Sequence, residues 1–429
     1  MYQKIKYRKI ENMLDYIFAF VLIYFTRSMW STIPAIHSVN IILYGLMVAT
    51  TVARLISSKS IKKKRFVGII IITLYLFLFS IIRPINIDDY IRICITTILT
   101  VLYISIQSRN GHNGENVLLA YERIILFITF LSLILWLTGP IAGILKPSGI
   151  VETSWSGSDA LKEVNTYYYL YFTPQEGNLF SLKGLTRNTS IFVEAPVCSY
   201  HLCIALMIEL FVKTKHNKLS VFVLCVGIVS SISMTGYAIA VLAISLHVFF
   251  SKNDRSIWRI IRIVILPIAT LSVVIVLYNI LQQRIGTGSG NTRIDDVVAG
   301  FKAWNDNILF GNGYGNALSY IQYMSSFRYF NKGFSNSPMQ ILAYGGLYLF
   351  FPYFLSFIIG LFHSLKHRNT LFFFMLFSGM LVVTVLPFQP LTIFVMLYFV
   401  LSNKSYTILS TAGSCYGIKL IEKGIKYGE

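Results

Sequence analysis

Long apolar stretches, separated by short polar segments, dominate the hydrophobic pattern of this chain. Most run for roughly 17 to 25 residues, the helix length that crosses a bilayer core about 30 Å thick. The pattern predicts an all-α bundle of about 12 membrane-spanning helices, one integral membrane domain over residues 1–429. The helices are expected near residues 13–33, 38–57, 66–83, 90–108, 118–138, 191–212, 219–233, 236–250, 259–281, 337–362, 371–386 and 388–402.

Two longer segments, residues 139–190 and 282–336, interrupt this pattern. Loops longer than about 15 residues in a compact protein are usually functional or disordered, and the many aromatic residues here argue against disorder. In the second segment, Ile294, Val298 and Phe301 recur at helical spacing, which predicts an amphipathic helix at the membrane surface. We therefore expect two large extracytoplasmic loops with short helices, and we expect the functional residues there.

Composition and charge agree with a membrane protein. Of the 429 residues, 55% are hydrophobic and 13% are charged, about half the charged share of a soluble domain. The net charge is +19, but the cations form short clusters separated by pairs of apolar stretches. The positive-inside rule gives this distribution when both termini are cytoplasmic. We interpret the charge as topology and expect no nucleic-acid partner, because the clusters lack interleaved stacking aromatics.

Arg187 and Glu194 flank the start of the sixth expected span. A carboxylate just inside an apolar run is costly and marks a functional site by default. Seven residues make about two helical turns, so the pair can share one face, which His201 would continue. Two alternatives stay open: an ion pair at the helix entry, and a histidine that is packed and hydrogen-bonded inside the bundle.

The second loop carries several cations without a matching surplus of acids. They are Arg284, Arg293, Lys302 and Arg328. A planar guanidinium binds a diphosphate bidentately and stays charged at any working pH. The alternative is a solvated helix face that touches lipid headgroups.

Asp88 and Asp89 are the candidate metal ligands, because paired carboxylates suit Mg²⁺ or Mn²⁺. Adjacent aspartates point apart on most backbones, and Arg83 and Arg92 are close enough in sequence to neutralise them. The five cysteines form no C-x-x-C pair, so they predict neither a zinc site nor a disulfide framework. We expect no metal and no cofactor.

Four stretches of the chain follow one another in a recognisable order: TRNTSIFVEAP (186–196), SISMTG (231–236), RIDDVVAGFKAWNDNILFGNGYGN (293–316) and SNSPMQILAYGGLYLF (335–350). Together they resemble motifs of the O-antigen polymerase and ligase superfamily, and the chain looks like a Wzy-type oligosaccharide repeat-unit polymerase. The chain departs from that pattern at Ser335, where ligases often carry histidine, and at Tyr344, where glutamate is frequent. The missing histidine favours a polymerase over a ligase.

The resemblance implies a metal-independent, inverting glycosyl transfer on the outer face of the bacterial plasma membrane. The substrate would be an undecaprenyl-diphosphate-linked oligosaccharide, and the partners would be membrane lipids, a chain-length regulator and a flippase. Arg187 and Arg293 would neutralise the leaving diphosphate, and Glu194 would orient or deprotonate the attacking hydroxyl. The remaining expected substrate contacts are Asn336, His201, Lys302, Arg328, Arg284 and Tyr314.

Two other functions stay open. An O-antigen ligase would transfer the finished glycan to lipid A core or protein, and it shares the donor half of the chemistry. A lipid-linked oligosaccharide flippase would need ionisable residues deep in many helices. The sequence instead indicates ionisable groups at the outer helix ends and in the loops, which favours an enzyme.

Overall fold

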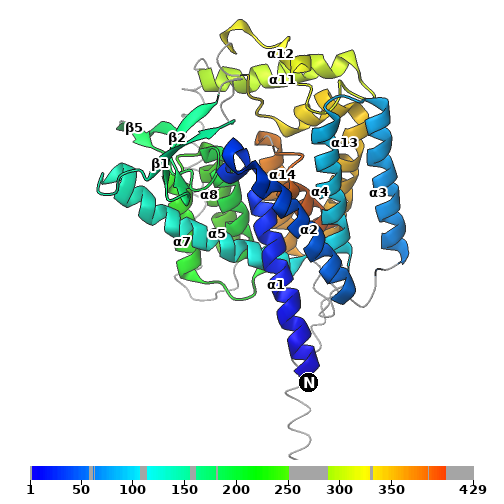
Figure 1. Cartoon of the computed structure of the whole chain (residues 1–429), viewed down its shortest axis with the longest axis horizontal. Coiled ribbons are helices and arrows are strands. Elements are labelled where there is room, and N and C mark those ends of the chain that lie inside the picture. Colours follow the sequence, from blue (N-terminus) through cyan, green and yellow to red (C-terminus); the bar gives the residue numbers. More distant parts are fainter. Residues whose placement is uncertain are drawn as a thin grey trace, which may run out of the picture.

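The structure is a computed structural model that describes residues 2–57, 61, 63–106, 114–154, 161–179, 182–250, 288–328, 332–384 and 386–401. Within these ranges the chain is mostly helical, and its long helices pack into a bundle (Figure 1). Five described helical segments are long and apolar enough to cross a membrane: Ser38–Ser57, Lys63–Ile82, Glu115–Ile141, Ala195–Val212 and Ser337–Ser364. These segments indicate a membrane protein, whereas the expected number of about 12 spans is not established.

The helices follow the apolar stretches of the sequence. Before the first long loop lie α1 (Tyr2–Phe25), α2 (His37–Ser57), α3 (Lys63–Ile82), α4 (Ile87–Ser105) and α5 (Glu115–Trp136). After it come α6 (Ala195–Met207), α7 (Lys218–Ser230), α8 (Met234–Phe249), α11 (Gly288–Asp306), α12 (Leu318–Ile321), α13 (Ser337–Ser364), α14 (Arg368–Val383) and α15 (Pro390–Leu401). The expected span at 259–281 lies outside the described residues. The expected first span, 13–33, is wrong at its end, because α1 stops at Phe25 and two short 3₁₀ turns follow.

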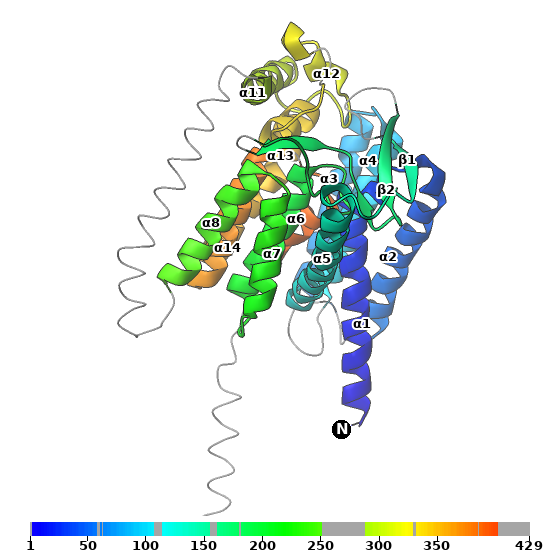
Figure 2. The same cartoon turned by 90° about the vertical axis from the view of Figure 1, so that its left-hand side faces the viewer.

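Helix α6 is the centre of the bundle. Its span, extended by a π-helical turn at Ile208–Val212, is 94% buried, whereas the span of α3 is 11% buried. Helices α5, α7, α8 and α14 contact α6 (Figure 2). A helix that is apolar on all sides is expected to be enclosed in this way.

The two long loops lie at the same end of the bundle, opposite the end at which α1 begins (Figures 1 and 2). We call this the loop end. The first loop forms two antiparallel sheets, one of β1 (Gly149–Thr153), β2 (Lys162–Tyr167) and β3 (Tyr171–Phe172), the other of β4 (Glu176–Leu179) and β5 (Leu182–Thr186). The expectation of helices alone is therefore wrong for this loop. The period-2 signal is short but present, since Val151 and Val164 are buried between exposed neighbours.

Helix α11 lies across the loop end beside α13 (Figure 1). It buries its acidic residues Asp295 and Asp296, and Arg328 contacts them at 3.3 and 2.7 Å. Its large apolar residues face outward: Ile294, Val297, Val298 and Phe301. The face of α11 that packs against the protein therefore combines buried ion pairs with the small residues Ala299 and Ala303.

Replacing Arg328 by alanine is expected to destabilise the second loop. Removing one partner of a buried ion pair leaves uncompensated charge and costs about 3–5 kcal/mol, and Arg328 is the cation for both Asp295 and Asp296. The measurement is the apparent melting temperature of the purified protein in detergent. Lys302→Ala is the matched control, because Lys302 is an exposed cation on the same loop; equal melting temperatures for the two variants would refute this role of Arg328.

Helix α13 is broken at Gly346, and the glycine-rich part of the second loop docks onto the break. Gly346 has φ 57° and ψ −155°, which is not helical. The Asn312 amide donates to the Ala343 carbonyl at 2.9 Å, and the Leu347 amide donates to the Ile308 carbonyl at 2.9 Å. A Cβ on Gly346 would lie 2.5 Å from the backbone nitrogen of Gly311. The glycine cluster therefore allows two backbones to approach closely.

Candidate functional site

Glu194 is the N-terminal capping residue of α6, at the loop end of the central helix. Its side chain makes no capping hydrogen bond. Instead, the Ala195 amide donates to Oε1 of Gln175 at 3.0 Å, so a side chain of the first loop caps the helix. The carboxylate of Glu194 faces Arg27, with Oε1 3.8 Å from Nη1. The Glu194 carboxylate therefore faces a cation and does not cap the backbone of its own helix.

Arg27 is the cation that faces Glu194, and sequence reasoning missed it. It lies in the link after α1, which ends where the Thr26 hydroxyl donates to the Leu22 carbonyl at 2.7 Å. The side chain of Arg27 is 14% exposed and that of Glu194 is 23% exposed. The missed signal was an arginine inside the apolar stretch 13–33, the kind of residue that marks a functional site.

Arg187 approaches the same carboxylate from the end of the first loop. Its Nε donates to the Ser231 carbonyl at 3.1 Å, and its Nη2 donates to the Ile232 carbonyl at 2.9 Å. These carbonyls belong to the link between α7 and α8. The stretches 186–196 and 231–236, which are far apart in sequence, therefore meet at one place. Arg187 acts electrostatically on Glu194, but it precedes α6, so the two residues do not share a helical face.

Three residues near this site have strained backbones. Arg27, Ser190 and Ile232 have φ values of 52°, 54° and 51°, in the left-handed region that non-glycine residues rarely adopt. For a β-branched residue such as Ile232, this conformation is a genuine outlier. Strained residues persist where the surrounding structure fixes them, and they cluster at functional sites. Here the strain directs the Ile232 carbonyl to Arg187 and places Arg27 opposite Glu194.

Tyrosine and phenylalanine side chains lie beside the charged groups. The Tyr314 ring lies 5.8 Å from that of Tyr344 and 5.1 Å from that of Phe388, and the Tyr320 ring lies 5.9 Å from that of Tyr344. Arg27 is close enough to all three tyrosines to interact with them electrostatically. Burial raises the pKa of both Tyr314 and Tyr320, so their hydroxyls stay protonated at neutral pH. The site thus combines charged groups with neutral hydroxyls and aromatic faces.

The pKa of Glu194 reflects two opposing effects. Burial raises the pKa of this carboxyl above its usual value, whereas the charges of Arg27 and Arg187 lower it. Burial also lowers the pKa of Arg27, and the Glu194 carboxylate opposes that shift. A carboxylate with a raised pKa can exchange a proton with a hydroxyl near neutral pH.

The other cations expected to bind substrate lie elsewhere in the structure. Arg293 and Lys302 are exposed on α11, and the charges that act on Glu194 are those of Arg27 and Arg187. Arg328 is buried against its two aspartates, which gives it a structural role instead of a substrate contact. Arg284 lies outside the described residues.

His201 and Asn336 are engaged within the protein. His201 is fully buried; its Nδ1 lies 2.8 Å from the Tyr121 hydroxyl and its Nε2 lies 3.0 Å from the Thr26 carbonyl. This is the packed histidine that the sequence left open, and it supports the link that carries Arg27. Asn336 caps α13, because its Oδ1 accepts from the Met339 amide at 2.9 Å. The full burial of His201 contradicts the expected substrate contact, whereas a substrate contact of the partly exposed Asn336 stays a prediction.

Two buried ion clusters lie toward the end of the bundle that is opposite the loop end. Arg54 contacts Asp15 at 2.5 Å, and both side chains are buried. Lys213 contacts Glu122 at 2.8 Å and Glu209 at 2.5 Å. The expectation that ionisable groups gather at the outer ends and in the loops is wrong at these two places, because internal pairing compensates the charges.

Asp88 and Asp89 are exposed at the start of α4, and Asp89 pairs with Arg92 at 3.2 Å. Among the residues that the structure describes, no group of three or more His, Cys, Asp or Glu side chains is placed to hold a metal ion. The groups that the described residues bring to the site are two guanidiniums, one carboxylate and tyrosine hydroxyls.

No protein-family model matches the chain, and no curated protein matches its sequence significantly.

Proposed function

We propose that this protein is a membrane glycosyltransferase that polymerises undecaprenyl-diphosphate-linked oligosaccharide repeat units into surface polysaccharide. The observation that carries the proposal is that two arginines act on Glu194 at the loop end of α6: Arg27 faces its carboxylate at 3.8 Å, and the charge of Arg187 lowers its pKa. The motif resemblance of the sequence supports the same reading. In this proposal the loop end faces outward and both termini are cytoplasmic.

Each residue of the site has a role in the proposed transfer. Arg27 and Arg187 neutralise the diphosphate as it leaves, because fixed cations help most where charge develops. Arg27 takes the place that the resemblance gives to Arg293, since Arg27 acts on Glu194. Glu194 accepts the proton of the attacking sugar hydroxyl, and the C–O bond to the new sugar forms as the bond to diphosphate breaks. Tyr314 supplies an aromatic face for a sugar ring.

A polymerase, a ligase and a flippase differ in which lipid-linked glycan accumulates when the gene is deleted. Loss of the polymerase is expected to leave single lipid-linked repeat units on the outer leaflet and no long glycan. Loss of a ligase would leave long glycan on its lipid carrier, and loss of a flippase would trap single units on the inner leaflet. Mass spectrometry of extracted lipid-linked glycans, combined with labelling of intact cells, distinguishes these outcomes; either of the latter two would contradict the proposal.

The pH profile of glycan polymerisation tests the role of Glu194. A general base acts when ionised, so the rate is expected to fall as the pH drops through the pKa of Glu194, above the usual range of a glutamate. Arg27→Gly removes a cation that lowers this pKa, so the acidic limb of the residual activity moves to higher pH. Arg27→Lys keeps the charge and is the matched control. If the acidic limb of the pH profile stays in place in Glu194→Gln, Glu194 is not the group that titrates.

A further inference from the structure

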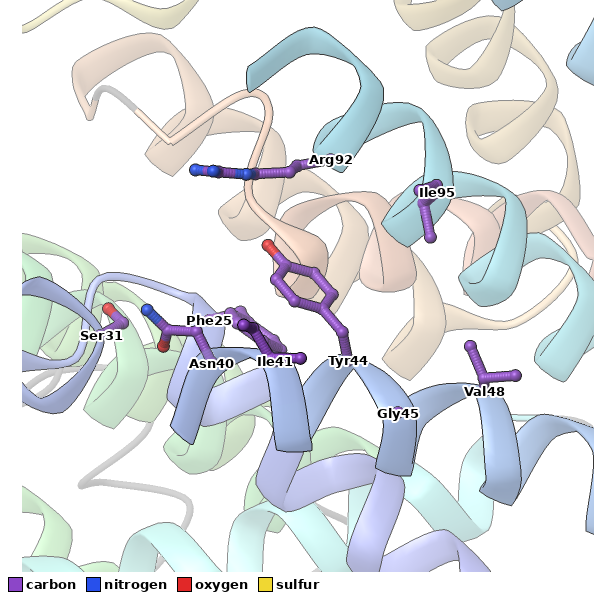
Figure 3. A pocket seen from close by; sticks show the side chains of 9 residues that line it. All are labelled: Phe25, Ser31, Asn40, Ile41, Tyr44, Gly45, Val48, Arg92 and Ile95. Carbon is purple, nitrogen blue, oxygen red and sulfur yellow. The ribbon is translucent and has the colours of Figure 1, made fainter. Parts of the chain in front are cut away.

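A groove lies between α2 and α4, and Figure 3 shows the side chains that line it. Its volume is about 560 Å³, within the roughly 300–1,000 Å³ of small-molecule sites. Apolar side chains form most of its wall, with polar residues near the loop end; the lining residues are Phe25, Ser31, Asn40, Ile41, Tyr44, Gly45, Val48, Arg92 and Ile95. Because this wall belongs to a candidate membrane span of α2, the groove faces lipid.

The length of the groove fits part of one lipid chain. Asn40 and Val48 are separated by two turns of α2, which is about 12 Å at about 1.5 Å per residue. One leaflet contributes roughly 15 Å of hydrocarbon, half of a bilayer core of about 30 Å. A chain that enters at Asn40 therefore stays in the leaflet at the loop end.

Arg92 lines the groove, and its ion-pair partner Asp89 lies one turn earlier on α4. Arg92 and Asp89 form an ion pair at 3.2 Å, with side chains 52% and 63% exposed. Such an exposed pair is weak, so a ligand with charges of both signs can replace it and pair with each side chain. A headgroup with negative charge alone would find one partner and would face the carboxylates of Asp89 and the neighbouring Asp88, which is also exposed. Charge complementarity thus selects a zwitterion.

We propose that the groove between α2 and α4 binds a zwitterionic phospholipid, with its phosphate on Arg92, its ammonium on Asp89 and one acyl chain against Tyr44, Val48 and Ile95. The charges of both signs at the mouth distinguish this site from the cationic pair at Glu194, which suits a diphosphate. The inner wall includes Phe25, which stacks on Tyr44 at 4.3 Å and precedes the link that carries Arg27. A lipid bound there packs against Phe25, next to the link that carries Arg27.

The test is native mass spectrometry of the full-length protein with added dioleoyl phosphatidylethanolamine or dioleoyl phosphatidylglycerol. Gly45→Leu fills the groove, since a Cβ on Gly45 meets nothing within 4 Å. Gly68→Leu is the matched control, because Gly68 on α3 has equal open space and does not line the groove. We expect Gly45→Leu and Arg92→Ala to weaken binding of phosphatidylethanolamine about tenfold, the effect of losing roughly 1.4 kcal/mol, and Gly68→Leu to leave it unchanged.

The choice of headgroup gives a second readout. The wild-type protein is expected to bind phosphatidylethanolamine more tightly than phosphatidylglycerol, and Asp89→Asn is expected to remove that preference. Equal or tighter binding of phosphatidylglycerol by the wild type would overturn the proposal, as would wild-type binding of phosphatidylethanolamine by Gly45→Leu. Both readouts measure bound lipid, so they stand apart from the proposed glycosyl transfer.

Discussion

Replacing Arg27 by glycine is expected to lower the rate of glycan polymerisation about 100- to 1,000-fold, the usual effect of removing one preorganised group that stabilises developing charge. The fold should persist. Glycine relieves a left-handed backbone at φ 52°, which costs other residues about 1–2 kcal/mol. The greater freedom of glycine in the unfolded chain offsets about 0.5–1 kcal/mol of this gain. The measurement is polymer yield per folded protein.

Two further variants test whether a charge alone suffices at position 27 and whether Arg187 is needed as well. Arg27→Lys keeps the cation but loses the planar fork that binds phosphate oxygens in pairs, so partial activity is expected. Arg187→Ala should match the loss of Arg27→Gly and should also lower stability, because Arg187 ties the first loop to the Ser231 and Ile232 carbonyls. Wild-type polymer yield from Arg27→Gly would refute the role of this cation.

Replacing Gly346 by alanine is expected to disrupt the contact between α13 and the second loop. Its backbone, at φ 57° and ψ −155°, lies in a region that non-glycine residues enter at a cost of about 1–3 kcal/mol. The new Cβ would also lie 2.5 Å from the Gly311 nitrogen, and such overpacking costs typically about 1–3 kcal/mol more. The melting temperature in detergent should fall markedly, and polymerisation should fall with it because Tyr314 follows the docked segment.

Gly379→Ala is the matched control for this substitution. Gly379 lies within α14, where a Cβ meets nothing within 4 Å. Alanine in a helix interior is more stable than glycine by about 0.5–1 kcal/mol, so this variant should melt at or above the wild-type temperature. A Gly346→Ala protein that melts with the wild type would show that the break in α13 does not need glycine.

The sequence predicted the long helices of the fold, but not the short strands or the break in α13. The apolar stretches predicted α2, α3 and α6 closely, because a bilayer-length hydrophobic run has few alternatives to a helix. The strands β1 and β2 were not predicted, since each has only five or six residues and the alternation of buried and exposed positions is too short to stand out. The break at Gly346 was also hidden, because it exists only when residues 308–313 dock there.

Only part of the candidate site could be predicted from the sequence. Arg187 and Glu194 were identifiable, because a charged residue at the edge of an apolar run is unusual. Arg27 carries the same signal, but an apolar stretch that continues to residue 33 gives no sign that α1 ends at Phe25. Gln175 and Ile232 gave no local signal, because a helix cap supplied from another loop and a strained backbone carbonyl arise only from tertiary contacts.

The most direct test of the proposed function is a reaction with purified components. The full-length protein, reconstituted in detergent, is incubated with undecaprenyl-diphosphate-linked repeat units alone, without nucleotide sugar and with EDTA present. The proposal predicts a ladder of glycans that differ by one repeat unit, absent from the Arg27→Gly reaction. Folded wild-type protein that yields no ladder from these substrates would contradict it.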